Sequence, residues 1–153
     1  MQVVTTIEGL RQRRRDWLLA GERVAFVPTM GNLHEGHLCL IDAAKRHADR
    51  CVVSIFVNPT QFNNKEDLIN YPNTLIPDLK ALELLQCDFV FTPSVKEVYQ
   101  QDPNTENFNF EGLDEVMEGK FRTNHFNGVA TIVKKLFLIT NPDKAYFGEK
   151  DYQ

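Results

Sequence analysis

Two histidines, His34 and His37, stand three residues apart in a segment whose composition suits phosphate binding. An apolar run ends near Pro28, glycines follow at Gly31 and Gly36, and an apolar helical pattern then resumes. This order predicts a strand, a turn and a helix, with both imidazoles on one face of the first helical turn, where free backbone N–H groups favour an anion. Imidazoles in that position can hydrogen-bond phosphate oxygens and, when protonated, offset the charge on a leaving phosphate.

The sequence does not favour a metal site at these histidines. No third Cys, Asp or Glu stands at the spacing of a zinc site. The three cysteines, Cys39, Cys51 and Cys87, also lack metal-type spacing, and their apolar surroundings predict buried, reduced thiols. We therefore expect no metal held by protein side chains alone.

Three further polar segments offer groups for a nucleotide and an acceptor. Asn58 and Gln61 follow a second apolar run, and their neutral amides suit a hydroxy acid. Residues 148–151 read Gly-Glu-Lys-Asp, where the lysine can pair with phosphates and the aspartate can position a ribose or a hydrated Mg²⁺. Arg122 and His125 lie between two glycines and could clamp an anion. Each segment alone also fits a strand cap, a surface turn or a solvated helix start, but together with the histidines they form a plausible nucleotide site.

The rest of the chain alternates extended and helical patterns, which predicts a parallel sheet with helices on both faces. Extended patterns cover residues 24–27, 51–57, 88–92 and 144–147, with an edge strand at 108–110. Helical patterns cover residues 5–20, 37–48, 76–85, 94–99, 113–118 and 129–140, and residues 63–73 are expected to form a surface loop. The expected fold is one α/β domain, residues 1–153, with a Rossmann-like, doubly wound sheet that binds ligands at the carboxyl ends of its strands.

The first helix carries the one strongly basic run, residues 11–15. Thr5 and Glu8 have the spacing of a capping box. The apolar face expected to point inward consists of Ile7, Leu10, Trp17 and Leu18. We interpret the basic run as a solvated helix face, because a formal charge of −4 and a pI near 5.6 disfavour a nucleic-acid binder.

No stretch approaches the length needed to span a membrane, and the first residues do not resemble a secretion signal. The sequence therefore predicts a cytoplasmic protein that does not bind membranes.

Four blocks, taken in order, resemble the pantothenate synthetase family. They are residues 28–31 with 34–37, 54–62, 125–131 and 146–153. The His-x-Gly-His motif alone is shared with a wider superfamily of adenylyl- and cytidylyltransferases, whereas the four blocks together are specific. The resemblance implies an ATP-dependent ligase that joins pantoate to β-alanine through a pantoyl-adenylate, with release of pyrophosphate and then AMP, on the route to coenzyme A.

The resemblance also implies roles for particular residues. His34 and His37 would act as the catalytic pair that assists the departing pyrophosphate. The implied ATP-binding residues are Met30, Gly31, Asn32, Leu33, His34, Glu35, Gly36, His37, Gly148, Glu149, Lys150 and Asp151. The implied substrate-binding residues are Gln61, which would hold pantoate, together with Asn58, Arg122 and His125. Mg²⁺ would bridge the phosphates of ATP, and the family suggests a homodimer.

The sequence stops at Gln153, inside the last block. The resemblance implies that a second pantoate-binding glutamine and a smaller C-terminal domain are absent, so that the chain corresponds to the N-terminal domain. Two other hypotheses stay open on the sequence alone. One is a stand-alone nucleotidylyltransferase, which the neutral amides of Asn58 and Gln61 disfavour because a phosphorylated acceptor calls for more basic residues. The other is a truncated, non-catalytic nucleotide-binding module.

Overall fold

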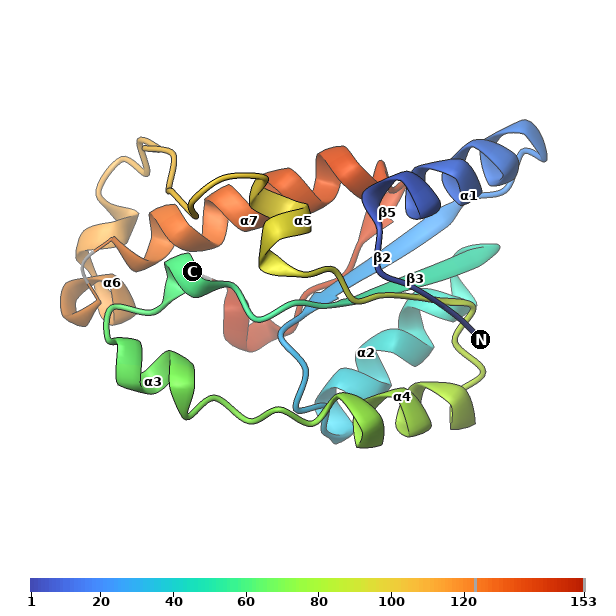
Figure 1. The fold of residues 1–153 in the computed structure, drawn as a ribbon, viewed down its shortest axis with the longest axis horizontal. Helices are drawn as coiled ribbons and strands as arrows, with labels where there is room; N and C mark the ends of the chain where they lie inside the picture. Colours follow the sequence, from blue (N-terminus) through green and yellow to red (C-terminus); the bar gives the residue numbers. More distant parts are fainter. Residues whose placement is uncertain (123, 153) are drawn as a thin grey trace.

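A computed structural model of the chain describes residues 1–122 and 124–152, so Thr123 and Gln153 lie outside the described residues. Five strands form one parallel sheet in the order β1-β4-β3-β2-β5 (Figure 1). Their bounds are β1 Gln2–Val4, β2 Val24–Thr29, β3 Arg50–Ile55, β4 Phe89–Phe91 and β5 Lys144–Ala145. The expected parallel, doubly wound sheet is confirmed.

Helices cover both faces of this sheet (Figure 1). The α-helices are α1 Ile7–Leu19, α2 Glu35–Arg46, α3 Lys65–Ile69, α4 Leu75–Leu84, α5 Val95–Tyr99, α6 Met117–Phe121 and α7 His125–Thr140, and short 3-10 helices are η1 Pro59–Gln61, η2 Leu113–Glu115 and η3 Glu149–Asp151. Side chains from α1, α5 and α7 share one buried cluster with the sheet, and side chains from α2 and α4 share the other. The core is therefore two apolar layers separated by the strands.

Strand β2 lies inside the sheet because its side chains are apolar on both faces. Val24 and Phe26 point into the cluster with α7, whereas Ala25 and Val27 point into the cluster with α2, and all four are fully buried. The strand continues through Pro28, where the sequence predicted an end. The backbone oxygen of Phe26 accepts from Tyr146 N on the β5 side of the strand. Because the backbone groups of alternate residues face the same neighbour, Pro28 faces β5 too. The N–H that Pro28 lacks would lie beyond the last residue of β5, so the sheet tolerates proline there.

Helix α1 differs from expectation at its start and on its faces. Its N-cap is Thr6, not Thr5, and the Thr6 side chain accepts from Gly9 N. Leu18, expected to face inward, is 61% exposed. Arg14, expected in a solvated run, is buried, because its guanidinium donates to Asn141 O at 2.8 Å and to the Asp143 carboxylate at 3.2 Å. Part of the basic run therefore anchors α1 to the end of α7.

Three local predictions are wrong for identifiable reasons. Residues 108–110 form no strand, and the N–H of Phe108 donates to Asn127 Oδ1 on α7 at 2.9 Å. The expected loop over 63–73 contains α3, capped by Asn64. Cys39 is exposed on α2, whereas Cys51 and Cys87 are buried as expected. Strand β1 was not expected, and it pairs with β4 at the edge of the sheet.

Among the residues that the structure describes, each helix is too short or too polar to cross a bilayer.

Candidate active site

The histidine turn joins the end of β2 to the start of α2, as the sequence predicted. His34 is the N-cap of α2 in an extended conformation, and its Nδ1 accepts from Gly36 N at 3.2 Å. The N–H of His34 in turn donates to Nδ1 of His37 at 3.4 Å. The two ring centroids lie 4.1 Å apart, so the helix start holds both imidazoles together.

This capping arrangement fixes which ring nitrogens can act on a ligand. A neutral imidazole carries one proton, and Nδ1 of each ring accepts a backbone hydrogen bond, so the proton belongs on Nε2 of His34 and of His37. Partial burial lowers the pKa of His37, and the positive charges of His34 and Lys150 lower it further against smaller opposite effects of Asp151 and Asp78. His37 is therefore a neutral Nε2–H donor at neutral pH in the absence of a ligand.

Residues 148–151 lie close to the histidines. They follow β5, which pairs with β2, so both polar segments leave the carboxyl ends of neighbouring strands. The charges of Lys150 and Asp151 both act on the pKa of His37, which places them within electrostatic range of that ring. Lys150 Nζ and Asp151 Oδ1 form an exposed ion pair at 2.6 Å. The two segments that the sequence analysis predicted to bind ATP therefore lie at the same edge of the sheet.

The turn between Met30 and His34 is held by a buried carboxylate that sequence reasoning did not identify. Asp78, in the first turn of α4, accepts from Asn32 N and Leu33 N, both at 2.9 Å. Gly31 and Asn32 both have positive φ angles, 79° and 53°, so the turn presents successive N–H groups to one anion. The N–H groups of Asn32 and Leu33 are therefore engaged inside the protein.

Asn58 stands at the end of β3 but is fully buried. Its Oδ1 accepts from Tyr99 OH at 2.6 Å and from Thr60 Oγ1 at 3.1 Å, and its Nδ2 donates to Gly128 O at 3.1 Å. A Cβ at Gly128 would lie 2.3 Å from Thr60 O, which shows how closely α7 approaches η1. The Asn58 amide makes these hydrogen bonds to other groups of the protein. This favours a role in positioning η1 over contact with a substrate.

Gln61 and His125 are neighbours, whereas Arg122 lies in a separate hollow. Gln61 is half-buried at the end of η1. Its backbone carbonyl oxygen lies 3.0 Å from Nδ1 of His125, at the start of α7. Arg122 lines a hollow of about 370 Å³ together with Asp114, Glu115, Lys120, Asn124 and Asn127. None of the residues of the histidine turn lines that hollow, so Arg122 is not brought to the histidines in this structure.

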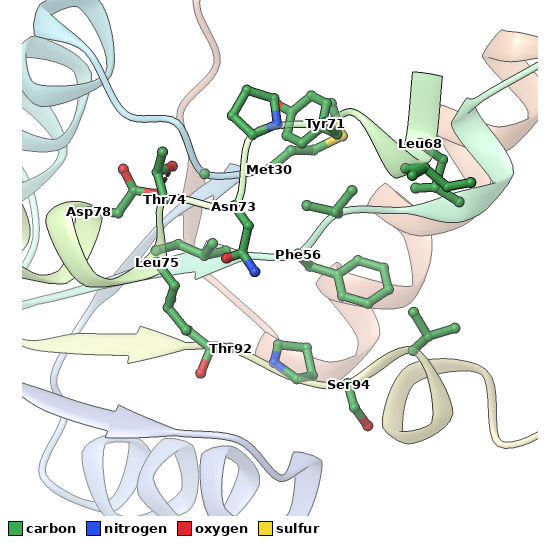
Figure 2. Close-up of a pocket in the computed structure, with 17 residues that line it drawn as sticks. Met30, Phe56, Leu68, Tyr71, Asn73, Thr74, Leu75, Asp78, Thr92 and Ser94 are labelled. Atoms are coloured by element: carbon green, nitrogen blue, oxygen red, sulfur yellow. Dashed lines mark hydrogen bonds between the residues drawn. The ribbon is translucent and has the colours of Figure 1, made fainter. Parts of the chain in front are cut away.

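A larger cavity of about 450 Å³ opens at the carboxyl ends of β2, β3 and β4 (Figure 2). Met30 and Phe56 line it from the strand ends, and Tyr71 and Leu75 line it from the segment before and within α4. Asp78 reaches the same cavity from α4. Of the residues named from the sequence, only Met30 and Gly31 line it. The one signal for Asp78 was Thr74 four residues earlier at a helix start, which does not reveal the partners of the carboxylate.

Comparison with known proteins identifies the family. Residues 2–153 match the sequence profile of the family described as pantoate-beta-alanine ligase. The chain belongs to the pantoate-beta-alanine ligase family. It is 52% identical to the pantothenate synthetase of Phocaeicola vulgatus over its whole length, and 52% identical to that of Photobacterium profundum. These alignments cover 54% and 52% of the two relatives, so the chain spans about half the length of the curated relatives it matches.

Solved structures of family members share the fold. Pantothenate synthetase from Thermus thermophilus superposes with a TM-score of 0.89 at 42% identity, over 99% of this chain and 53% of that one. The pantoate-beta-alanine ligase from Francisella tularensis, a complex with beta-gamma ATP and beta-alanine, gives a TM-score of 0.88 at 41% identity, over 95% of this chain and 55% of that one. The pantoate-beta-alanine ligase fold thus extends over nearly all of the chain.

Proposed function

We propose that this chain is the nucleotide- and pantoate-binding part of an ATP-dependent ligase that makes pantothenate from pantoate and β-alanine. The observation that carries the proposal is the placement of His34, His37 and residues 148–151 at the carboxyl ends of neighbouring strands, in a chain that belongs to the pantoate-beta-alanine ligase family. Ligands of doubly wound sheets bind at this edge. The complex of the Francisella tularensis relative with beta-gamma ATP and beta-alanine supports the same ligands here.

The proposed reaction has two steps. A carboxylate oxygen of pantoate attacks the α-phosphorus of ATP, the bond from that phosphorus to the bridging oxygen breaks, and pyrophosphate leaves. The amine of β-alanine then attacks the acyl carbon, the acyl C–O bond breaks, AMP leaves, and the amine loses a proton. Adenylation is needed because a free carboxylate is a poor acyl donor.

The side chains around the histidine turn suit the first step. Nε2–H of His34 and of His37 would donate to phosphate oxygens as negative charge builds on the departing pyrophosphate. Lys150 would pair with the same phosphates once its exposed bond to Asp151 is exchanged. Gln61 would hold pantoate, with an amide that donates to the carboxylate and accepts from a hydroxyl. Glu35, the first residue of α2, would place its backbone N–H near the phosphates, whereas the N–H of Gly36 donates to His34 Nδ1.

Mg²⁺ would enter with ATP and would offset negative charge on the phosphates. Within residues 1–122 and 124–152, no group of three His, Cys, Asp or Glu side chains converges as a metal site. Asp78 is occupied by backbone N–H groups and Asp151 by Lys150, which fits an ion carried mainly by phosphates and water. The protein would supply the surrounding hydrogen bonds.

Two further parts of the proposal concern the context of the chain. We place the protein in the cytoplasm, where ATP and the substrates of such a biosynthetic ligase occur. We also propose a homodimer, as the family resemblance suggests. Sedimentation equilibrium of the purified protein tests the dimer, and a single species of 17.6 kDa would contradict it.

An oxygen-labelling experiment tests the reaction. It uses a longer chain, called the full-length chain below. This chain contains the present 153 residues and has the length of the curated relatives. With pantoate labelled by ¹⁸O in the carboxyl group, the two steps above transfer one labelled oxygen to AMP. Mass spectrometry of the product should show AMP with one ¹⁸O. Unlabelled AMP formed together with pantothenate would exclude the pantoyl-adenylate.

A further inference from the structure

The contacts of Asp78 set it apart from the other carboxylates near the site. Its side chain is buried, and its two oxygens accept from Leu33 N, Asn32 N and Thr74 Oγ1, each at 2.9 Å. Asn32 N also donates to Thr74 Oγ1 at 3.0 Å. A buried carboxylate requires such donors, because an unpaired charge is costly away from water. Here two of the three donors, the N–H groups of Asn32 and Leu33, belong to the turn that leads to the candidate catalytic histidines.

The turn has little else to fix its shape. Gly31 and Asn32 both adopt positive φ angles, which a residue other than glycine rarely does. Gly31 N donates to Thr29 Oγ1 at 3.2 Å, and the next two N–H groups go to Asp78. Asp78 Oδ2 also sits 2.9 Å from where a Cβ of Gly31 would lie, so the turn wraps tightly around this carboxylate.

The turn leads directly to the histidines. Leu33, whose N–H is bound by Asp78, immediately precedes His34, the N-cap of α2. The His34 N–H then fixes His37 through Nδ1. A shift of the turn would therefore change the direction of both Nε2–H groups, and displacements of about 1 Å are enough to impair catalysis.

From these contacts we propose that Asp78, assisted by Thr74, is the positioning residue of the active site, because it holds the Gly31–Leu33 turn in the one shape that aims His34 and His37 at the phosphates of ATP. The role rests on the proposed ligase function. The carboxylate acts through its hydrogen bonds to the turn. It occupies the N–H groups of Asn32 and Leu33, which leaves the imidazoles and the start of α2 to bind the phosphates.

Asp78→Asn in the full-length chain tests the proposal. The new amide keeps the size of the side chain but presents an NH₂ group to a backbone N–H, so one bond to the turn is lost. Pantoate-dependent pyrophosphate release should fall in kcat/KM for ATP by about tenfold or more, the scale of one hydrogen bond to a charged group. Because pantoate is proposed to bind at Gln61, its KM should change less than twofold.

Asp143→Asn is the matched control. Asp143 likewise accepts from a backbone N–H, Val24 N at 2.7 Å, but at the opposite end of β2 from the histidine turn. Its loss should lower thermal stability without lowering kcat/KM. If Asp78→Asn lowers stability as Asp143→Asn does and leaves kcat/KM unchanged, Asp78 is only a structural brace and the proposal is wrong.

A second pair of variants and a second readout keep the test independent of folding and of activity. Thr74→Val removes the hydroxyl that bonds both Asn32 and Asp78, whereas Thr74→Ser retains it, so only the valine variant should lose kcat/KM. Nitrogen-15 NMR of the 153-residue chain should show His37 protonated at Nε2 in the wild type and a mixture of tautomers in Asp78→Asn. Unchanged tautomers would contradict the positioning role even if no ligase activity is found, whereas an inactive full-length wild-type chain would contradict the proposed function alone.

Discussion

His34 caps helix α2 while its own backbone N–H donates to Nδ1 of His37 across 3.4 Å, so a single helix start orients both imidazoles. The arrangement leaves Nε2–H of each ring as the group that can meet a phosphate. The proposed role of the two histidines is therefore hydrogen-bond donation to the phosphates of ATP.

Replacement of His37 should therefore remove transition-state stabilisation. In the full-length chain, His37→Ala is expected to slow pantoyl-adenylate formation by about 10²-fold or more, the usual scale for one preorganised donor. Single-turnover measurement of pyrophosphate release checks this. His47→Ala is the control, since His47 lies at the other end of α2 and bonds Ala43 O. An unchanged rate in His37→Ala, or stoichiometric zinc in the purified protein, would exclude the donor role.

The histidine turn could be predicted from sequence because its signals are local. An apolar strand, glycines and a helical pattern follow one another within about fifteen residues, and parallel strands gather their carboxyl ends at one edge. Residues 148–151 could be predicted to lie at this edge for the same reason, because they follow another strand of the sheet. Asp78 could not be predicted, because its partners lie about 45 residues away and depend on how α4 packs against the turn.

Asn58 and the segment 108–110 show the same limit. An amide after a strand suits a ligand or a buried network equally well, and only the packing of α7 and α5 around Asn58 decides for the network. The aromatic alternation at 108–110 resembles a strand, but the N–H of Phe108 donates to the Asn127 side chain on α7 instead of to a neighbouring strand. In both cases a tertiary contact overrides the local pattern.

The lowered pKa of His37 predicts a pH dependence of stability. In the unfolded chain the imidazole titrates near its ordinary pKa of about 6.5, whereas in the folded chain it titrates lower. As the pH falls below about 6.5, the unfolded state takes up the proton first, so the free energy of unfolding decreases until the folded-state pKa is reached. Urea unfolding across this range should show a smaller loss for His37→Gln than for the wild type. Equal losses would contradict the lowered pKa.

Gln61→Ala tests the placement of pantoate. The Gln61 side chain is half-buried beside the start of α7 and can both donate and accept. Its loss should weaken pantoate binding by about tenfold, with less than a twofold change for ATP, since one hydrogen bond to a charged group is lost. Calorimetric titration of the full-length chain measures both ligands, and Gln12→Ala on the exposed face of α1 should change neither. Equal weakening of the two ligands would instead indicate a misfolded loop.

Gly31→Ala tests how tightly the turn closes on Asp78. The Cβ would lie 2.9 Å from Asp78 Oδ2 and 3.1 Å from Ile55 Cγ2, at a φ of +79°. Gly21 has a similar φ of +72° with nothing within 4 Å, so Gly21→Ala isolates the backbone cost, about 1 kcal/mol. Chemical denaturation should show Gly31→Ala to be about 1–3 kcal/mol less stable than Gly21→Ala. Equal stabilities would show that the turn can relax away from the carboxylate.

Pyrophosphate release with ATP, Mg²⁺ and pantoate tests the central claim most directly. The 153-residue chain should fold, because buried apolar clusters pack on both faces of its sheet, and we expect it to bind ATP weakly. Adenylation needs the phosphates held on both sides and water excluded. We predict pantoate-dependent pyrophosphate release by the full-length chain and almost none by the 153-residue chain. Equal rates for the two chains would contradict this account.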